Sequence, residues 1–191
     1  MFQPLDFSFM NFKEVTGNEN CCNSHYLDRF IKARAKNINR YLLVIKKNQN
    51  GKWTTQTLKL NNNQIEDITA IPALANEIFN DISSLTWLDV SCNKISSIPN
   101  TISNLRCLKI FYVHGNQIRS FQDVLKLKQL PLLSKLTLHG NPIEKEKGYF
   151  HVVLSILPRL VTLDFTGISR ADQQTAALIR IPGQNKRQKE Q

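Results

Sequence analysis

The sequence has little of what marks a secreted, membrane-embedded or metal-organised protein. Only four of its 191 residues are cysteine, and they form neither a CxxC motif nor a spaced Cys/His set. A disulfide scaffold and a zinc finger are therefore not expected. No apolar run approaches the ~20 residues that a membrane-spanning helix needs, and the first residues do not resemble a signal peptide. We expect a cytoplasmic protein with no cofactor, no bound metal and no membrane partner.

Acidic residues are also scarce relative to basic ones. The formal net charge is +10, and its excess per residue is largest in the two flanks. Residues 1–52 carry nine basic and four acidic side chains, and residues 171–191 carry four and two. The basic cluster within residues 29–52 is either a solvated face or a contact for an acidic surface such as tubulin or RNA. Because no RNA-binding motif accompanies it, a protein partner is preferred and nucleic acid is not expected.

What the sequence does have is an internal repeat. Four segments, which begin at residues 55, 85, 108 and 133, fit the pattern L-x-x-L-x-L-x-x-N-x-I. A degenerate fifth begins at Leu160 and lacks the asparagine. The asparagines are 30, 23 and 25 residues apart, close to the roughly 20–29 residues of leucine-rich repeats. We therefore predict an α/β fold, a short leucine-rich-repeat solenoid with a parallel concave sheet and a helical convex side.

Each repeat position has a physical reason. Positions 4 and 6 alternate on a short strand and point into the core, and in the fifth repeat they are Leu163 and Phe165. Helices are expected over residues 71–84, 101–105, 121–130 and 146–157, where apolar residues recur at helical spacing between prolines. At position 9, an asparagine side chain can pair with the N–H and C=O groups of neighbouring turns. The predicted asparagine ladder consists of Asn63, Asn93, Asn116 and Asn141.

Both ends of a repeat stack need a cap, which suggests three parts for the chain. Residues 1–52 form a basic extension, residues 53–178 the repeat domain with its C-terminal cap, and residues 179–191 a basic polar tail. Residues 41–55 consist of YLLVIKK, a turn with Asn-Gly at 50–51, and KWTT, an order typical of a β-hairpin. We expect this hairpin to cover the open edge of the first repeat.

Several motifs together resemble the leucine-rich repeat-containing protein 51 family. They are the sequences PLDFSF at 4–9, LNNN at 60–63, His-Gly-Asn at 114–116 and 139–141, NPIEKEKGY at 141–149, LDFTG at 163–167 and RAD at 170–172. The resemblance implies a non-enzymatic, cytoplasmic protein of ciliated or flagellated organisms. Such a protein would be a structural component of the ciliary axoneme, with axonemal or microtubule-associated proteins or tubulin as partners.

The candidate binding residues lie at positions 3, 5 and 7 of each strand, which point away from the core. Exposed aromatic patches mark interfaces, and Trp and Tyr are frequent binding hot spots. The alternative is that an arm of the chain itself covers this patch. The candidate protein-binding residues are Trp87, Asp89, Ile110, Tyr112, His114, Lys135 and His139.

Other chemistry on this face is less well supported. His114 and His139 could share a metal with Cys92 nearby, but zinc sites take three or four protein ligands. Ser91, His114 and Asp89 suggest a catalytic triad, but an open sheet offers no oxyanion hole. We therefore predict a protein-interaction adaptor that is not an enzyme. The alternatives are a nucleic-acid-associated adaptor, like the spliceosomal A-prime family, and a phosphatase-regulating repeat protein.

Overall fold

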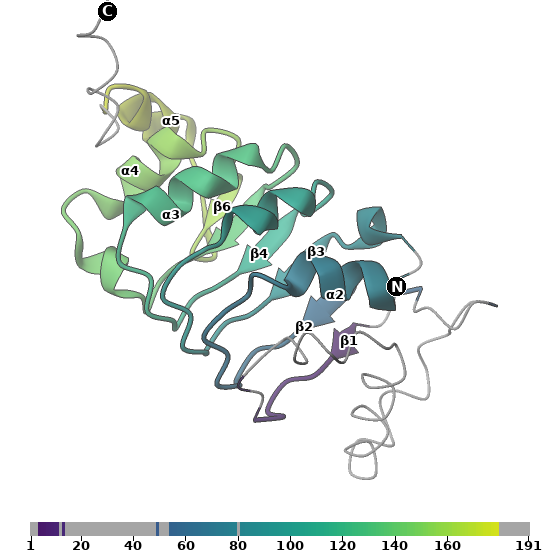
Figure 1. Ribbon diagram of the computed structural model, residues 1–191. Helices are drawn as coiled ribbons and strands as arrows, with labels where there is room; N and C mark the ends of the chain where they lie inside the picture. The colour runs from purple at the N-terminus through teal and green to yellow at the C-terminus, as the bar shows by residue number, and fades with distance from the viewer. Residues whose placement is uncertain (1–3, 12, 14–48, 50–53, 80, 180–191) are drawn as a thin grey trace, which may run out of the picture.

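The computed structural model describes residues 4–11, 13, 49, 54–79 and 81–179. They form one sheet of seven strands in chain order, with the helices on one side of it (Figure 1). β1 to β6 pair in parallel and β7 pairs antiparallel with β6. The predicted leucine-rich-repeat solenoid is thus confirmed. The strands are β1 (Leu5–Asp6), β2 (Thr57–Lys59), β3 (Trp87–Asp89), β4 (Ile110–Tyr112), β5 (Lys135–Thr137), β6 (Thr162–Leu163) and β7 (Thr166–Gly167).

Neighbouring strands pair at equal repeat positions. Position 4 of each repeat stands opposite position 4 of the next, in the order Leu58, Leu88, Phe111, Leu136 and Leu163. All five side chains are fully buried. A shift of one residue would turn this apolar column toward the open face, so its burial fixes the register.

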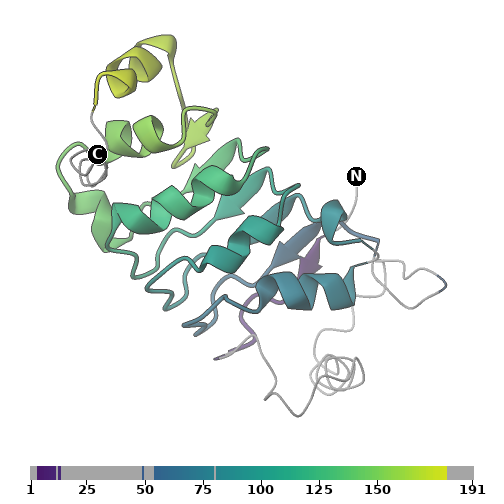
Figure 2. The ribbon, with the colours of Figure 1, turned by 45° about the horizontal axis from the view of Figure 1, so that its top comes forward.

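The helical segments cover one face of the sheet (Figure 2) and mostly follow the predicted ranges. The range 101–105 holds a 3₁₀ turn instead of an α-helix, because a 23-residue repeat leaves few residues between strands. The last helix was not predicted; Ser169 and Asp172 form a capping box at its start. The helices are α2 (Ile71–Ile78), α3 (Phe121–Lys126), α4 (Tyr149–Ile156) and α5 (Arg170–Ala177), and the 3₁₀ turns are η3 (Ile82–Ser84), η4 (Asn100–Asn104), η5 (Leu127–Gln129) and η6 (Pro142–Lys145).

The core lies between the sheet and the helices. Strand positions 4 and 6 and the position-11 isoleucines, such as Ile95 and Ile118, are buried together with apolar residues of the helical segments. Burial of each such side chain contributes about 1.5–3 kcal/mol. Within the described residues, no helix is both long and apolar enough to cross a lipid bilayer.

The outer edge of the first repeat is covered by β1. Leu5 and Asp6 pair in parallel with Leu58 and Lys59, and Phe7 N–H donates to the Lys59 carbonyl at 2.8 Å. We expected a hairpin from residues 41–55 at this edge. Residues 41–48 and 50–53 of that segment lie outside the described residues, and the strand that occupies the edge of β2 is β1. The N-terminal segment is therefore part of the repeat sheet.

At the other end, Phe165 corrects a sequence prediction. Its position in the fifth repeat predicted a core side chain, but the ring is 63% exposed. Asp164 and Phe165 both adopt positive φ angles, 52° and 63°, between β6 and β7. This turn reverses the chain and replaces the expected alternation, so Phe165 lies over the open face instead of under it. There it contacts the rings of Tyr112, His114 and His139.

Candidate functional site

Aromatic side chains from successive repeats lie side by side on the open face of the sheet. The Trp87 and Tyr112 rings meet edge to face with centroids 5.7 Å apart, and Phe165 meets Tyr112 in the same way at 5.3 Å. Such pairs contribute about 0.5–1.5 kcal/mol each beyond their area burial. The rings therefore hold each other in place and form a preorganised surface. We name Trp87, Tyr112, His114, His139 and Phe165 the concave cluster.

The two histidines of the cluster stack face to face. Their ring centroids are 4.5 Å apart and their planes differ by 9°. His114 Nδ1 lies 2.8 Å from Thr137 Oγ1, and His139 Nδ1 lies 3.2 Å from Asp164 Oδ1. Partial burial, and then the neighbouring His139, lower the pKa of His114. A neutral His114 ring is therefore favoured, which suits an aromatic contact surface.

Trp87 has an unusual environment for its polar atom. Its Nε1 is out of contact with water and, within the described part of the chain, has no hydrogen-bond partner. The Lys59 ammonium lies 5.4 Å from the centroid of the Trp87 ring. An unpaired buried donor costs about 1–3 kcal/mol. The free protein thus carries a donor that a hydrogen-bond acceptor from outside could satisfy after a small movement.

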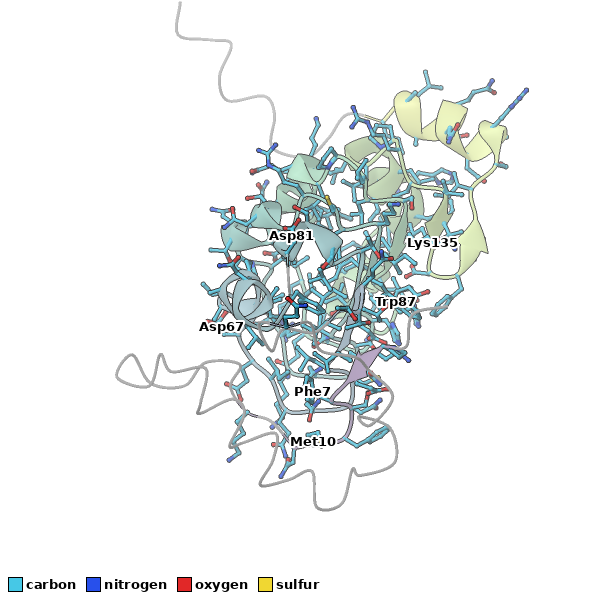
Figure 3. All side chains as sticks on the ribbon, turned by 90° about the vertical axis from the view of Figure 1, so that its right-hand side faces the viewer. Phe7, Met10, Asp67, Asp81, Trp87 and Lys135 are labelled. Atoms are coloured by element: carbon cyan, nitrogen blue, oxygen red, sulfur yellow. The ribbon has the colours of Figure 1, made fainter. Side chains whose placement is uncertain are left out.

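The other candidate binding residues lie around the cluster and differ in their exposure to solvent. Ile110 is half-buried and Lys135 is exposed. Asp89 is buried, and its carboxylate accepts hydrogen bonds from the backbone N–H and hydroxyl of Ser91. Asp89 therefore lies beneath the contact surface. The pKa of the neighbouring Tyr112 is raised mainly by burial and, to a smaller extent, by the Asp89 carboxylate. Figure 3 shows Trp87 and Lys135 on the side of the molecule opposite Asp67.

The asparagines of position 9 connect the turns below the cluster. Asn116 Nδ2 donates to the carbonyls of Val90 and Val113, and its Oδ1 accepts from the N–H of Ile95. Asn93 and Asn141 bond across neighbouring turns in the same way. At the end of the series, Asn63 Nδ2 reaches the Phe7 carbonyl at 3.0 Å. These side chains have a structural role that keeps the strands in register.

Asp164 belongs to the site although it was not among the candidate binding residues; its position 5 in the fifth repeat predicted only an outward side chain. One carboxylate oxygen accepts from the N–H groups of Leu138 and His139 at 2.6 and 2.9 Å, and the other accepts from the Tyr149 hydroxyl at 2.7 Å. Burial, and then this carboxylate, strongly raise the pKa of Tyr149. Asp164 thus joins the β6–β7 turn to the fourth repeat, through other N–H groups than those that the asparagine ladder pairs. The sequence signal was an acidic residue within the degenerate LDF segment at 163–165.

The geometry does not bring together a hydrolytic triad. Ser91 Oγ donates to Asp89 Oδ1 at 2.6 Å, whereas His114 bonds to Thr137. Within the described ranges, no group of three or more His, Cys, Asp or Glu residues is placed to hold a metal ion. What the arrangement offers is a contact surface of rings, with the Lys59 ammonium near its Trp87 end.

Known proteins support the repeat assignment. The family model described as leucine rich repeat matches residues 54–118. Among solved structures, the SNF/U2A′ complex of Drosophila melanogaster superimposes with a TM-score of 0.55 at 21% identity, over 69% of this chain and 72% of that one. At this identity the likeness shows the fold alone.

Curated relatives carry a narrower description. Leucine-rich repeat-containing protein 51 of Homo sapiens is 42% identical over 135 residues, which are 71% of this chain and 70% of the human protein. The Mus musculus protein is 42% identical over 142 residues, 74% of each chain. The repeat family supports a protein–protein interaction scaffold. Identity and coverage together show that this chain belongs to the leucine-rich repeat-containing protein 51 family.

Proposed function

We propose that the chain is a non-enzymatic structural adaptor that docks a partner protein on the concave cluster. The observation that carries this proposal is the aromatic surface itself. Positions 4 and 6 of the first four repeats, together with Leu163, complete the core, so the rings of Trp87, Tyr112 and Phe165 are not required to close the solenoid. Large amphipathic rings on an open face are typical of binding hot spots.

The chemistry of the cluster suggests how a partner is held. An apolar side chain of the partner would pack among the rings, where displacing water is favourable. A carbonyl or carboxylate of the partner would accept from Trp87 Nε1 and remove the cost of the unpaired donor. Lys135, exposed beside Ile110, favours an acceptor that carries negative charge, whereas the Lys59 ammonium over Trp87 already lies 3.9 Å from Asp6 Oδ2.

The resemblance in the sequence supports a cellular setting for this adaptor. It favours a structural component of the ciliary or flagellar axoneme, with axonemal or microtubule-associated proteins or tubulin as partners. Fluorescent tagging of the full chain in ciliated cells tests this setting. Signal along the axoneme is the expected result, and a nuclear or uniformly cytoplasmic signal would contradict it.

The docking surface is tested by the double substitution Trp87→Ala/Tyr112→Ala. Each ring is expected to contribute on the order of 2 kcal/mol to binding, so loss of both should weaken the affinity on the order of 1,000-fold and recovery of partners from ciliary extract should collapse. Circular dichroism should remain native-like. The matched control is Phe9→Ala, which removes a ring that is 76% exposed and lies outside the cluster. If the folded double variant still recovers every partner, the concave cluster is not the interface.

A further inference from the structure

The turns that lead into β4, β5 and β6 carry positive charge without compensation. Segments 103–110, 127–136 and 157–163 contain five basic residues and no Asp or Glu. The turn at 141–148, on the opposite ends of the strands, instead mixes two glutamates with two lysines. We name Arg106, Lys109, Lys128, Lys135 and Arg159 the basic rim.

Backbone hydrogen bonds place these turns next to one another. The Lys109 carbonyl accepts from the N–H groups of Ser134 and Lys135 at 2.9 and 3.0 Å, and the Ser134 carbonyl accepts from Val161 at 2.7 Å. Consecutive turns are therefore about 4.8 Å apart, as in any sheet. Arg159 donates to the Pro131 carbonyl at 3.3 Å, which holds its guanidinium beside the preceding turn. The repeat thus stacks like charges along one edge of the molecule.

The turns of the basic rim contain no acidic residue of their own, although Asp81 lies in the turn before β3. All five basic side chains are exposed, and none forms an ion pair within the described residues. In the preceding turn of the same edge, Asp81 accepts a hydrogen bond from Ser83 N–H at 2.8 Å. The flanks of the chain are themselves basic, with nine basic against four acidic residues in 1–52. In the free protein these exposed charges are therefore balanced by ions in solution, and they remain available to an acidic partner.

Apolar side chains are exposed among the charges. Leu132 is 48% exposed and Val161 is 59% exposed, and both belong to the turns of the basic rim. The three segments contain no Phe, Trp or Tyr, so they offer no ring on which a nucleotide base could stack. We infer that the basic rim is a second docking surface, which takes an acidic segment of a partner protein with apolar side chains between its carboxylates.

Binding of a fluorescein-labelled peptide of about fifteen residues, rich in Glu with interspersed Leu, tests this inference on the full chain. Fluorescence anisotropy is measured at low salt, where charge attraction is strongest. Lys109→Glu/Lys128→Glu should weaken binding on the order of ten-fold. The control Lys94→Glu/Lys147→Glu alters the net charge equally at exposed positions of the opposite edge and should change affinity less than about two-fold. Equal effects of the two variants would overturn the proposal.

Carbodiimide cross-linking gives a second readout, because it joins a peptide carboxylate directly to a lysine amine. Cross-links to Lys109 or Lys128 support the proposal, and cross-links confined to residues 1–52, or to Lys135 beside the concave cluster, overturn it. A single-stranded RNA or an anionic vesicle that binds the rim more tightly than the peptide would also overturn it. The rim substitutions leave the concave cluster intact, so a failure here leaves the proposed aromatic docking site untouched.

Discussion

The two ends of the repeat stack are closed in different ways. At the N-terminal end, β1 pairs with β2 although the two strands are far apart in the sequence; the bond from Asn63 to the Phe7 carbonyl spans 56 residues. At the C-terminal end, β6 and β7 are neighbours in the chain, and Asp164 between them bonds to the preceding repeat. The N-terminal cap is thus formed by a segment far from the first repeat in the sequence, and the C-terminal cap by residues next to the last repeat.

This difference has an energetic consequence. Closing a long loop costs conformational entropy that a two-residue turn does not. The N-terminal cap repays this cost by burying Leu5 and Phe7, which are 0% and 6% exposed. The C-terminal cap also buries apolar side chains, among them Leu160 and Leu163, and the Asp164 carboxylate adds hydrogen bonds to the fourth repeat. We therefore expect the first repeat to open more readily than the last. The central repeats, which the asparagine ladder joins, should be the most stable part of the domain.

The largest expected effect lies between the two ends, at Asn116. Asn116→Leu leaves the N–H of Ile95 and several turn carbonyls unpaired, so the free energy of unfolding should fall by about 3–5 kcal/mol. Urea unfolding measures this change. Asn104→Leu, at an exposed position, is the control and should change little. A midpoint shift near zero for Asn116→Leu would show that the asparagine ladder does not stabilise the fold.

Leu5→Ala tests the remote cap. It truncates a fully buried side chain and should destabilise by about 2–4 kcal/mol. Hydrogen exchange should accelerate at the amides of β2 more than at those of β5, because the first repeat opens first. Phe9→Ala is the matched control in the same segment. Equal acceleration throughout the sheet would mean that the N-terminal end does not open independently.

Asp164→Ala tests the local cap. Loss of bonds to two backbone N–H groups and the Tyr149 hydroxyl should cost about 1–3 kcal/mol. Tyr149→Phe removes one of these bonds and should cost about 1 kcal/mol. Thermal unfolding of both variants gives the comparison. A larger loss of stability for Tyr149→Phe than for Asp164→Ala would contradict the view that the Asp164 carboxylate holds this cap together.

The smallest effect concerns pH at the open face. Burial lowers the pKa of His114 below its ordinary value of 6.5. As the pH falls through that value, the unfolded chain binds a proton before the folded protein does, so stability declines. In urea unfolding between about pH 7.5 and pH 5.5, His114→Asn should show a shallower decline than the wild type. Parallel curves would show that His114 does not contribute.

These two caps also show what the sequence could and could not predict. The repeat spacing predicts the parallel sheet and the buried column, because each repeat position has a fixed side-chain direction. Phe165 could not be placed this way, since two consecutive residues with positive φ interrupt the alternation. The pairing of β1 could not be read either, because no local pattern connects residues 5 and 58. The aromatic candidates Trp87 and Tyr112 lie together, whereas Asp89 turns out to be buried beneath them.

Site-specific photo-cross-linking tests the central claim, that partners dock on the concave cluster, most directly. Benzoylphenylalanine replaces Tyr112 in one variant of the full chain and Gln122, an exposed residue of α3 behind the sheet, in another. Each variant is irradiated in ciliary extract, and the cross-linked species are compared. A partner cross-linked from position 112 and not from position 122 is the predicted result. A partner cross-linked from position 122 and not from position 112 would contradict the account.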